Sequence, residues 1–210
     1  MGPLQLLRAL LQARRLIRRV KPVLAVGFGG FVSAPGGLAA RLAGVPLVIH
    51  EQNAVAGLTN RALSHLAKRV YAAFPQAFGG RAEVVGNPVR DDIAALGEHA
   101  RVADQMRGRR LRLLVVGGSL GALALNQQMP RALAELPPES RPEVRHQAGR
   151  DKDQATREGY QAAGVDAEVS DFIADMADAY DWADLVVCRS GALTVAELAA
   201  AAQPALFVPF

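Results

Sequence analysis

The sequence contains very little cysteine, because Cys188 is the only one in 210 residues. A single cysteine excludes an internal disulfide framework and is typical of a protein from a reducing compartment. Cys188 lies within an apolar run that resembles a strand. We therefore predict that its thiol is buried and chemically inert.

Long hydrophobic runs are also absent. No apolar stretch approaches the roughly 20 residues that a membrane-spanning helix needs. Arginines interrupt the N-terminal segment and no small-residue cleavage site follows it, so we do not expect a signal peptide. The chain is nevertheless 50% hydrophobic and has 20 glycines, which suits one large or two small α/β domains with substantial cores.

Acidic residues are scarce in the first part of the chain. Residues 1–90 contain 12 lysines and arginines but only Glu51 and Glu83, a net charge of +10. Residues 91–210 contain 12 basic and 18 acidic residues, a net charge of −6. This division predicts two domains with different partners, the basic one facing lipid headgroups, a diphosphate lipid or nucleic acid. An ordinary arginine-rich composition would also explain the excess.

The sequence has no paired histidines at metal-ligand spacing. His50, His65, His99 and His146 form no H-x-x-x-H pair, so we do not expect a protein metal site. The segment Asp151-Lys152-Asp153 matches a D-x-D metal-binding pattern. However, it begins a predicted helix, where carboxylates favour the positive end of the helix dipole.

Short apolar runs alternate with helix-like segments throughout the chain. The predicted strands are residues 23–26, 45–49, near 70, near 84, 111–116, 144–147, 167–169, 185–187 and 205–208. Sequential βα units require right-handed crossovers and a parallel sheet, so the pattern predicts an α/β fold with two Rossmann-like domains. A turn cluster at residues 86–90 places the boundary, giving domains of residues 1–90 and 91–210.

The first predicted helix, residues 4–20, has two apolar stripes rimmed by arginines. One stripe comprises Leu6, Leu10, Ala13, Ile17 and Val20, and the second comprises Leu4, Leu7 and Leu11. Two such stripes indicate a face that also touches a membrane surface. A buried apolar side opposite a solvated basic side is the alternative.

Polar and glycine-rich segments follow the predicted strands of the first domain. Residues 27–37 are predicted to form a glycine-rich loop. The tetrad His50-Glu51-Gln52-Asn53 follows the next strand, where binding residues collect in parallel sheets. It could bind sugar hydroxyls, with His50 or Glu51 moving protons. Loop capping, with His50 hydrogen-bonded to the backbone, is the alternative.

Three segments of the second domain indicate a nucleotide site. Residues 117–122 resemble a phosphate-binding loop in which Ser119 adds a hydroxyl donor, although tight turning also explains the glycines. Ile173 could contact a flat base through its backbone, or simply begin a helix. The Ser190-Gly191 turn precedes a helix predicted over residues 194–202. Glu197 in that helix could accept ribose hydroxyls, or be an ordinary solvated glutamate.

Six segments resemble, in order, those of the MurG family. They are GFGGFVSAPGGLAARLAGVPLVIHEQNAVAGLTN, AFPQAF, VVGNPVR, VVGGSLGALALNQ, DFIADMADAYDWADLVVCRSGALTVAELAAA and PALFVPF. The family transfers N-acetylglucosamine from UDP-N-acetylglucosamine to undecaprenyl-diphospho-muramyl-pentapeptide, which converts lipid I to lipid II in peptidoglycan synthesis. The resemblance implies the GT-B fold, an inverting hexosyltransferase, and no cofactor or catalytic metal.

The resemblance also implies roles for particular residues. Asn53 would contact the sugar, Arg90 would stand at the interdomain cleft near the donor, Ser119 would meet the diphosphate and Ile173 the uracil. The segment Ala192, Leu193, Thr194, Val195, Ala196 and Glu197 would frame the nucleotide, with Glu197 on the ribose. Gly29, Gly30 and Ser33 would lie in a loop facing the acceptor diphosphate. The catalytic base is unassigned, with His50 and Glu51 as candidates.

The implied partners are UDP-N-acetylglucosamine, lipid I and an anionic membrane surface, with no nucleic acid. The implied location is peripheral, on the cytoplasmic face of the bacterial plasma membrane. The family's first glycine-rich loop and the segment expected after Phe210 are absent, and Phe31 and Leu120 replace a common tyrosine and glutamine. We therefore expect a fragment truncated at both ends and incomplete for catalysis. A noncatalytic nucleotide- or lipid-binding remnant and a related glycolipid synthase remain alternatives, whereas the loop spacing disfavours a dinucleotide oxidoreductase.

Overall fold

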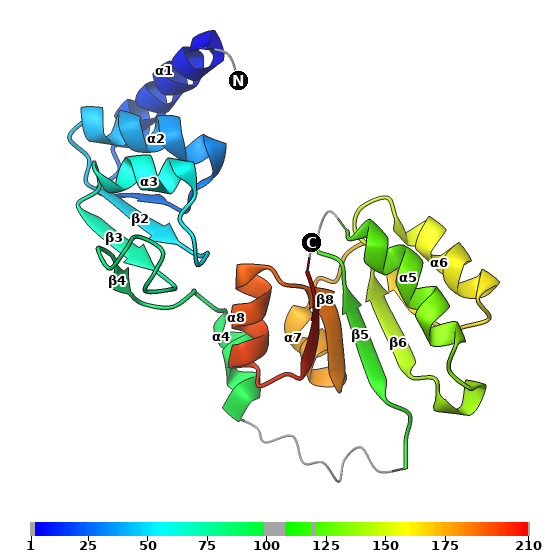
Figure 1. The fold of residues 1–210 in the computed structure, drawn as a ribbon. Helices are drawn as coiled ribbons and strands as arrows, with labels where there is room; N and C mark the ends of the chain where they lie inside the picture. The colour runs from blue at the N-terminus through cyan, green and yellow to red at the C-terminus, as the bar shows by residue number, and fades with distance from the viewer. Residues whose placement is uncertain (1–2, 99–107, 119–120, 210) are drawn as a thin grey trace. The chain divides into compact units, whose positions relative to one another are not determined.

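The computed structural model describes residues 3–98, 108–118 and 121–209. The chain divides into two compact units, Met1–Asn87 (unit 1) and Pro88–Phe210 (unit 2). Each unit contains one sheet, and every strand pair in both sheets is parallel. Figure 1 shows helices packed against each sheet. The prediction of an α/β fold with two parallel sheets is confirmed.

Unit 1 contains three helices and a four-stranded sheet among its described residues. The elements are α1 (Pro3–Val20), β1 (Ala25–Gly27), α2 (Gly30–Leu42), β2 (Leu47–Glu51), α3 (Leu58–Ser64), β3 (Arg69–Ala72) and β4 (Glu83–Val84). The strands follow the order β1-β2-β3-β4. The core of the unit lies beneath α2 and α3, where Leu47 and Ile49 of β2 pack with Leu63 of α3.

The prediction of a glycine-rich loop over residues 27–37 was wrong, because α2 begins at Gly30. Glycine and Pro35 lower the intrinsic helix propensity of this segment, but tertiary packing overrides that preference. Gly37 is buried against α3, and a Cβ atom there would lie 2.9 Å from both methyl carbons of Leu63. Gly37 is therefore needed where α2 and α3 approach closely.

Helix α1 is only partly covered by the rest of unit 1. Leu10, Ala13 and Ile17 are half-buried, and α1 packs on α2. Leu6 and Val20 of the first stripe are 50% and 61% exposed, so the alternative of a wholly buried apolar side does not hold. The second stripe of leucines is exposed along its length.

Unit 2 contains a five-stranded sheet with helices on both faces. Its elements are α4 (Asp91–Ala94), η1 (Ala95–Glu98), β5 (Arg112–Val116), α5 (Leu123–Ala134), η3 (Pro138–Ser140), β6 (Glu143–Gln147), α6 (Asp153–Ala162), β7 (Glu168–Ser170), α7 (Met176–Trp182), β8 (Leu185–Arg189), α8 (Ala192–Ala200) and β9 (Ala205–Val208). Helix α8 begins and ends two residues earlier than predicted. Its end is set by Ala202, whose φ of 50° cannot continue a helix.

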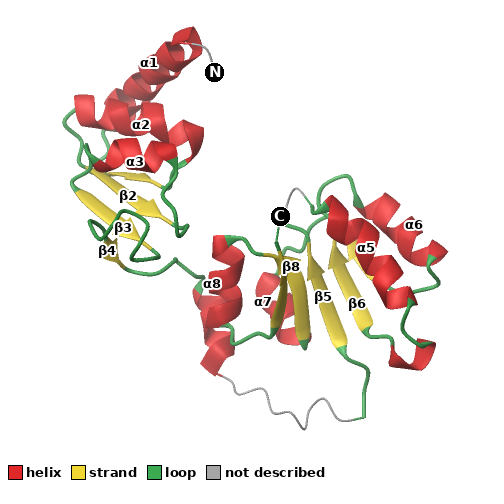
Figure 2. Ribbon diagram, in the orientation of Figure 1, coloured by secondary structure: helices red, strands yellow, loops and turns green. Residues whose placement is uncertain are grey.

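The strands of this sheet lie in the order β7-β6-β5-β8-β9. From β5, the next strands along the chain are added on one side, and β8 and β9 are then added on the other, so the order reverses between β5 and β8. One apolar cluster packs α5 and α6 on one face of the sheet, and another packs α4, α7 and α8 on the other face. Figure 2 shows these helix layers on either side of the strands. In doubly wound sheets of this kind, ligands bind beyond the carboxyl ends of the strands where the order reverses.

Cys188 lies within β8 and is fully buried. Burial raises the pKa of its thiol to about 11, so it stays protonated near neutral pH. The prediction that Cys188 is buried is confirmed. No helix in the described part of the chain is both long enough and apolar enough to span a membrane.

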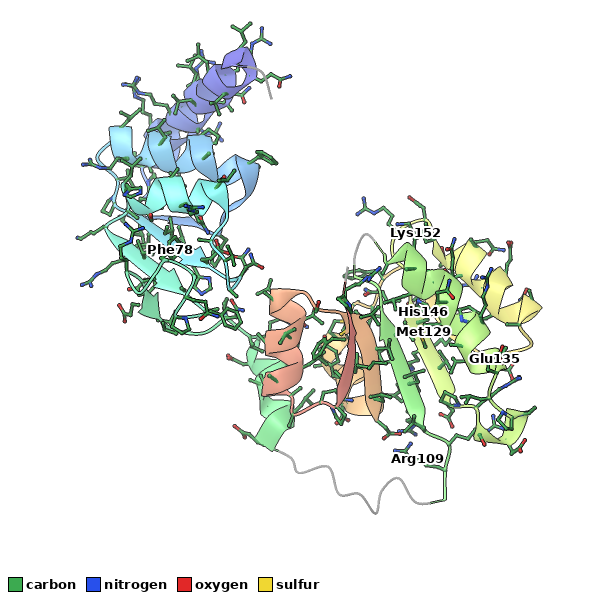
Figure 3. The ribbon with its side chains drawn as sticks, viewed as in Figure 1. Phe78, Arg109, Met129, Glu135, His146 and Lys152 are labelled. Carbon is green, nitrogen blue, oxygen red and sulfur yellow. The ribbon has the colours of Figure 1, made fainter. Side chains whose placement is uncertain are left out.

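A buried polar network joins β6 to α5 and α6 in unit 2. Figure 3 marks His146, which is fully buried and lies 2.9 Å from the Tyr160 hydroxyl through Nδ1 and 3.1 Å from Asn126 Oδ1 through Nε2. Asn126 in turn donates its amide to the carbonyl of Ala148 at 2.9 Å. Since Asn126 Oδ1 can only accept, Nε2 carries the imidazole proton and Nδ1 accepts from Tyr160.

This network makes the stability of unit 2 depend on pH. Burial lowers the pKa of His146 to about 4, whereas an unfolded histidine titrates near 6.5. The unfolded chain therefore binds the extra proton first as pH falls. The contribution of neutral, buried His146 to the free energy of unfolding is complete above pH ~6.5. It falls by up to about 1.4 kcal/mol per pH unit as the pH decreases towards 4.

Urea unfolding between pH 5 and 7, followed by the fluorescence of Trp182, measures this slope, because that residue is the sole tryptophan and lies in unit 2. We expect His146→Gln to be less stable and to lose most of the slope. His65→Gln, at an exposed histidine of unit 1, is the matched control. An unchanged slope in His146→Gln would contradict this assignment.

Candidate functional site

The strand ends of unit 2 bring two predicted nucleotide segments together. Val116, the last residue of β5, is in register with Gln147 of β6 and Cys188 of β8. The glycine-rich segment that follows β5 and the turn that follows β8 therefore leave the sheet side by side, at the reversal of strand order. This is the position where a parallel sheet offers a ligand crevice.

The glycine-rich segment after β5 packs closely on the end of β6. A Cβ atom at Gly117 would lie 2.9 Å from Gln147 O, and one at Gly121 would clash with Ala148 O. Gly118 has φ +78° with open space around its Cβ position. Close backbone approach therefore explains two glycines, and left-handed backbone explains the third. Ser119, the predicted diphosphate residue, lies outside the described residues, as does Leu120.

Helix α8 carries the predicted nucleotide frame. Its N-cap is Gly191, and no side chain of the described structure caps that end. Leu193 is 49% exposed, while Ala192, Thr194, Val195, Ala196 and Glu197 are half-buried. A carboxylate oxygen of Glu197 accepts a hydrogen bond from the Tyr180 hydroxyl at 3.1 Å. Glu197 is therefore held by a neighbouring helix rather than being an unattached surface glutamate.

The predicted base-binding segment borders a cavity beside β7. Ile173 is half-buried against the core, whereas Phe172 is 61% exposed. With Ser170 they line a cavity of about 300 Å³. Residue Asp175 then caps α7, its side chain accepting from the backbone N–H of Asp178 at 2.9 Å. The segment thus both begins a helix and presents an apolar wall, so the two explanations offered by the sequence are compatible.

Arg90 stands at the N-cap of α4, in unit 2. Its guanidinium lies 3.8 Å from the Asp92 carboxylate and its side chain is 51% exposed. Helix α4 packs against both α7 and α8. The side chain is therefore exposed on an element that packs against α8, which carries predicted nucleotide contacts, and against α7, which follows Ile173.

In unit 1, the carboxylate of Glu51 organises the loop after β2. One oxygen accepts from the backbone N–H of Asn53 at 3.0 Å and from its side-chain amide at 2.9 Å. The other accepts from Gly57 N–H at 3.1 Å and from the Asn60 amide at 2.9 Å. Burial acts to raise the pKa of Glu51, but these hydrogen bonds outweigh burial and hold the pKa below its ordinary value. The hydrogen bonds favour the ionised carboxylate and give it a structural role.

His50 is also held by the backbone. Its Nε2 lies 2.9 Å from Gly86 O, and since a carbonyl only accepts, Nε2 carries the proton. Nδ1 is then an acceptor, and it is buried without a hydrogen-bond partner among the described residues. The ring packs at 5.7 Å from Phe28. This arrangement favours the loop-capping explanation over direct proton transfer, although the bare Nδ1 retains the capacity to accept.

Gly29, Gly30 and Ser33 lie at the start of α2 rather than in an extended loop. Gly29 and Gly30 have φ of +85° and +78°, which favour glycine. The Ser33 hydroxyl donates to Gly29 O at 2.6 Å. The expectation of a loop is corrected here, while the two glycines still leave the N-terminus of a 13-residue helix without a side-chain cap in the described structure.

The D-x-D segment has an ordinary structural role. Asp153 lies in the first turn of α6 and pairs with Arg157, one turn later, at 3.5 Å. Across the ranges that the structure describes, no three histidine, cysteine, aspartate or glutamate side chains gather in a metal-binding group.

Sequence reasoning missed two residues that hold the predicted contacts in place. Asn60, 1% exposed, bonds both Glu51 and the backbone of His50. Tyr180, also 1% exposed, bonds Glu197. The position of Asn60, a polar residue within a short predicted helix, could have suggested a buried hydrogen-bonding role. Nothing in the sequence connects Tyr180 to a residue 17 positions later.

Two family descriptions match separate parts of the chain. Residues 1–72 match the glycosyltransferase family 28 N-terminal domain, and residues 112–210 match the glycosyltransferase family 28 C-terminal domain. The matched segments fall in unit 1 and unit 2 respectively.

Curated relatives match the chain over its whole length. A protein of Chromohalobacter salexigens named UDP-N-acetylglucosamine–N-acetylmuramyl-(pentapeptide) pyrophosphoryl-undecaprenol N-acetylglucosamine transferase is 67% identical over 211 residues, covering 100% of this chain and 58% of the relative. A Pseudomonas fluorescens protein of the same name is 57% identical, covering 99% of this chain and 58% of the relative. The chain thus spans less than two thirds of these relatives.

A solved structure shares both sequence and fold. The crystal structure of MurG from Acinetobacter baumannii is 44% identical, with a TM-score of 0.71, and the match covers 100% of this chain and 59% of that one. The GT-B fold expected from the resemblance is therefore confirmed for the matched part. The chain belongs to the MurG family, within glycosyltransferase family 28.

Proposed function

We propose that the protein to which this chain belongs transfers N-acetylglucosamine from UDP-N-acetylglucosamine to lipid I, forming lipid II in peptidoglycan synthesis. The observation that carries the proposal is the 67% identity, without loss of any segment of this chain, to a protein named for that reaction. It would act as an inverting hexosyltransferase and serve cell-wall growth and division.

Unit 2 would bind the donor nucleotide. The N-termini of α5 and α8 follow strands on either side of the reversal of strand order, and helix N-termini favour anions such as a diphosphate. Glu197 would accept ribose hydroxyls, and Ile173 would meet the uracil through its backbone. Ser119 would meet the diphosphate, Arg90 would lie near the donor, and residues 192–196 would frame the nucleotide.

Unit 1 would bind the sugar and the acceptor. Asn53 is exposed, and its backbone and amide are both fixed by Glu51, which suits a side chain that must meet a sugar hydroxyl in one orientation. The Gly29-Gly30 helix start, with Ser33, would face the acceptor diphosphate. We assign Glu51 to positioning, because its oxygens are occupied by four donors. His50 stays a candidate for accepting a proton.

Helix α1 would attach the protein to the cytoplasmic face of the bacterial inner membrane. Leu4, Leu7 and Leu11 are 75%, 53% and 47% exposed on one side of the helix. Arginines flank them, and the first 90 residues carry a net charge of +10. An exposed apolar stripe with basic neighbours supports peripheral binding to anionic lipid.

The transfer reaction can be tested in a hybrid protein. This chain would replace the matched segment of the Chromohalobacter salexigens relative, and the product would be assayed with labelled UDP-N-acetylglucosamine and a lipid I analogue. We expect lipid II formation within about tenfold of the relative, because the site residues come from a close homologue. A folded hybrid that forms no product, beside an active relative, would contradict the proposed reaction.

Membrane attachment can be tested by vesicle sedimentation. The chain should bind vesicles that contain anionic lipid, less strongly as salt rises, since surface charge is screened. Replacing Leu4, Leu7 and Leu11 with serine should weaken binding at least severalfold. Serine at Val85, Leu123 and Leu136, which are exposed elsewhere, is the matched control. Equal binding by the two triple variants would reject this role for α1.

A further inference from the structure

Tyr180 is a buried tyrosine whose hydroxyl meets a carboxylate in unit 2. The residue lies on α7 and is 1% exposed, among the apolar side chains that pack α4, α7 and α8 on the sheet. Its hydroxyl donates to Glu197 Oε2 at 3.1 Å. Burial, together with the charge and hydrogen bond of Glu197, raises the pKa of Tyr180, so the hydroxyl remains a donor throughout the physiological range.

Its place in the fold connects three segments of the candidate site. Helix α7 begins directly after the segment that contains Ile173, and α8 carries Glu197. The positive charge of Arg90, at the N-cap of α4, is near enough to Tyr180 to act against the rise in its pKa. A single buried ring therefore lies among the segments that contain Ile173, Glu197 and Arg90, which are proposed to meet the base, to meet the ribose and to lie near the donor.

The hydrogen bond from Tyr180 restricts the side-chain orientation of Glu197 without using all of the carboxylate's acceptor positions. A carboxylate has two oxygens and about four acceptor positions, so a hydrogen bond at Oε2 leaves room for ribose hydroxyls. A half-buried glutamate on a helix would otherwise sample several side-chain rotamers, and ordering one on binding reduces affinity. A fixed donor from the core removes part of that loss beforehand.

We propose that Tyr180 is a positioning residue for nucleotide recognition. Its hydroxyl holds the Glu197 carboxylate in the orientation that accepts the ribose hydroxyls, and its ring ties that carboxylate to the base-binding segment. The inference rests on the proposed function, specifically on a uridine nucleotide binding in unit 2. Tyr180 touches Glu197 rather than the substrate, so it acts through that residue.

Calorimetric titration of the chain with UDP and with 2′-deoxy-UDP tests the inference. The unaltered chain should prefer UDP, because the deoxy compound lacks one hydroxyl for Glu197. Tyr180→Phe keeps the ring and removes the donor. We expect it to weaken UDP binding by about two- to tenfold, the range of a typical hydrogen bond, and to reduce the preference for UDP over 2′-deoxy-UDP.

Tyr160→Phe is the matched control. Tyr160 is equally buried at 1% exposure, and its hydroxyl also has a side-chain partner, His146, but it lies on the opposite face of the sheet. Tyr160→Phe should lower stability without changing the preference for UDP. A Tyr180→Phe variant that lost only stability, with the affinity and preference of the unaltered chain, would overturn the inference.

Glu197→Gln separates this inference from the proposed function on which it rests. If Tyr180 acts through Glu197, Tyr180→Phe should have little further effect on UDP affinity in the Glu197→Gln background. Additive losses in the double variant would overturn the positioning role. Unchanged UDP binding in Glu197→Gln, or no binding by the unaltered chain, would instead contradict the proposed donor site itself.

Discussion

Parallel strand pairing is the constraint on which the candidate site depends. All strands in both sheets are parallel, so every loop that follows a strand emerges at the same edge of its sheet. In unit 2 the order reverses between β5 and β8, and the register sets Val116 beside Cys188. The glycine-containing segments that follow β5 and β8 are therefore neighbours, and so are the N-termini of the helices α5 and α8. Strand register alone places them there.

Both units contain a polar side chain that is held in place by a buried polar neighbour. A partly exposed polar side chain, suited to meet a ligand, is held by a buried polar neighbour: Asn53 by Glu51, and Glu197 by Tyr180. In unit 1 the buried amide of Asn60 supports the carboxylate in turn. Preorganisation of this kind reduces the side-chain entropy lost on binding. Mutational loss of function at a buried position can therefore arise without any contact to substrate.

The sequence alone predicted most of the fold, because apolar runs separated by glycine turns indicate parallel strands. It placed the tetrad with Asn53 after a strand and Glu197 in the helix after a strand and a Ser-Gly turn, and the structure has both segments in those places. It failed at residues 27–37, where packing of Gly37 against Leu63 supports a helix that propensity disfavours. It also left open whether the apolar side of the first helix is buried, and Leu6 is exposed there. Tyr180 and Asn60 were missed since their partners are set by tertiary packing, which no local pattern encodes.

We propose that the nucleotide binds in unit 2 and that Asn53 of unit 1 contacts the donor sugar. Calorimetric titration of the chain with UDP, which carries no sugar beyond its ribose, tests this most directly. Glu197→Ala should weaken UDP binding roughly ten- to hundredfold, as expected for loss of a charge-assisted hydrogen bond, whereas Asn53→Ala should leave it unchanged. Equal affinity in Glu197→Ala and the unaltered chain, or a comparable loss in Asn53→Ala, would contradict the account.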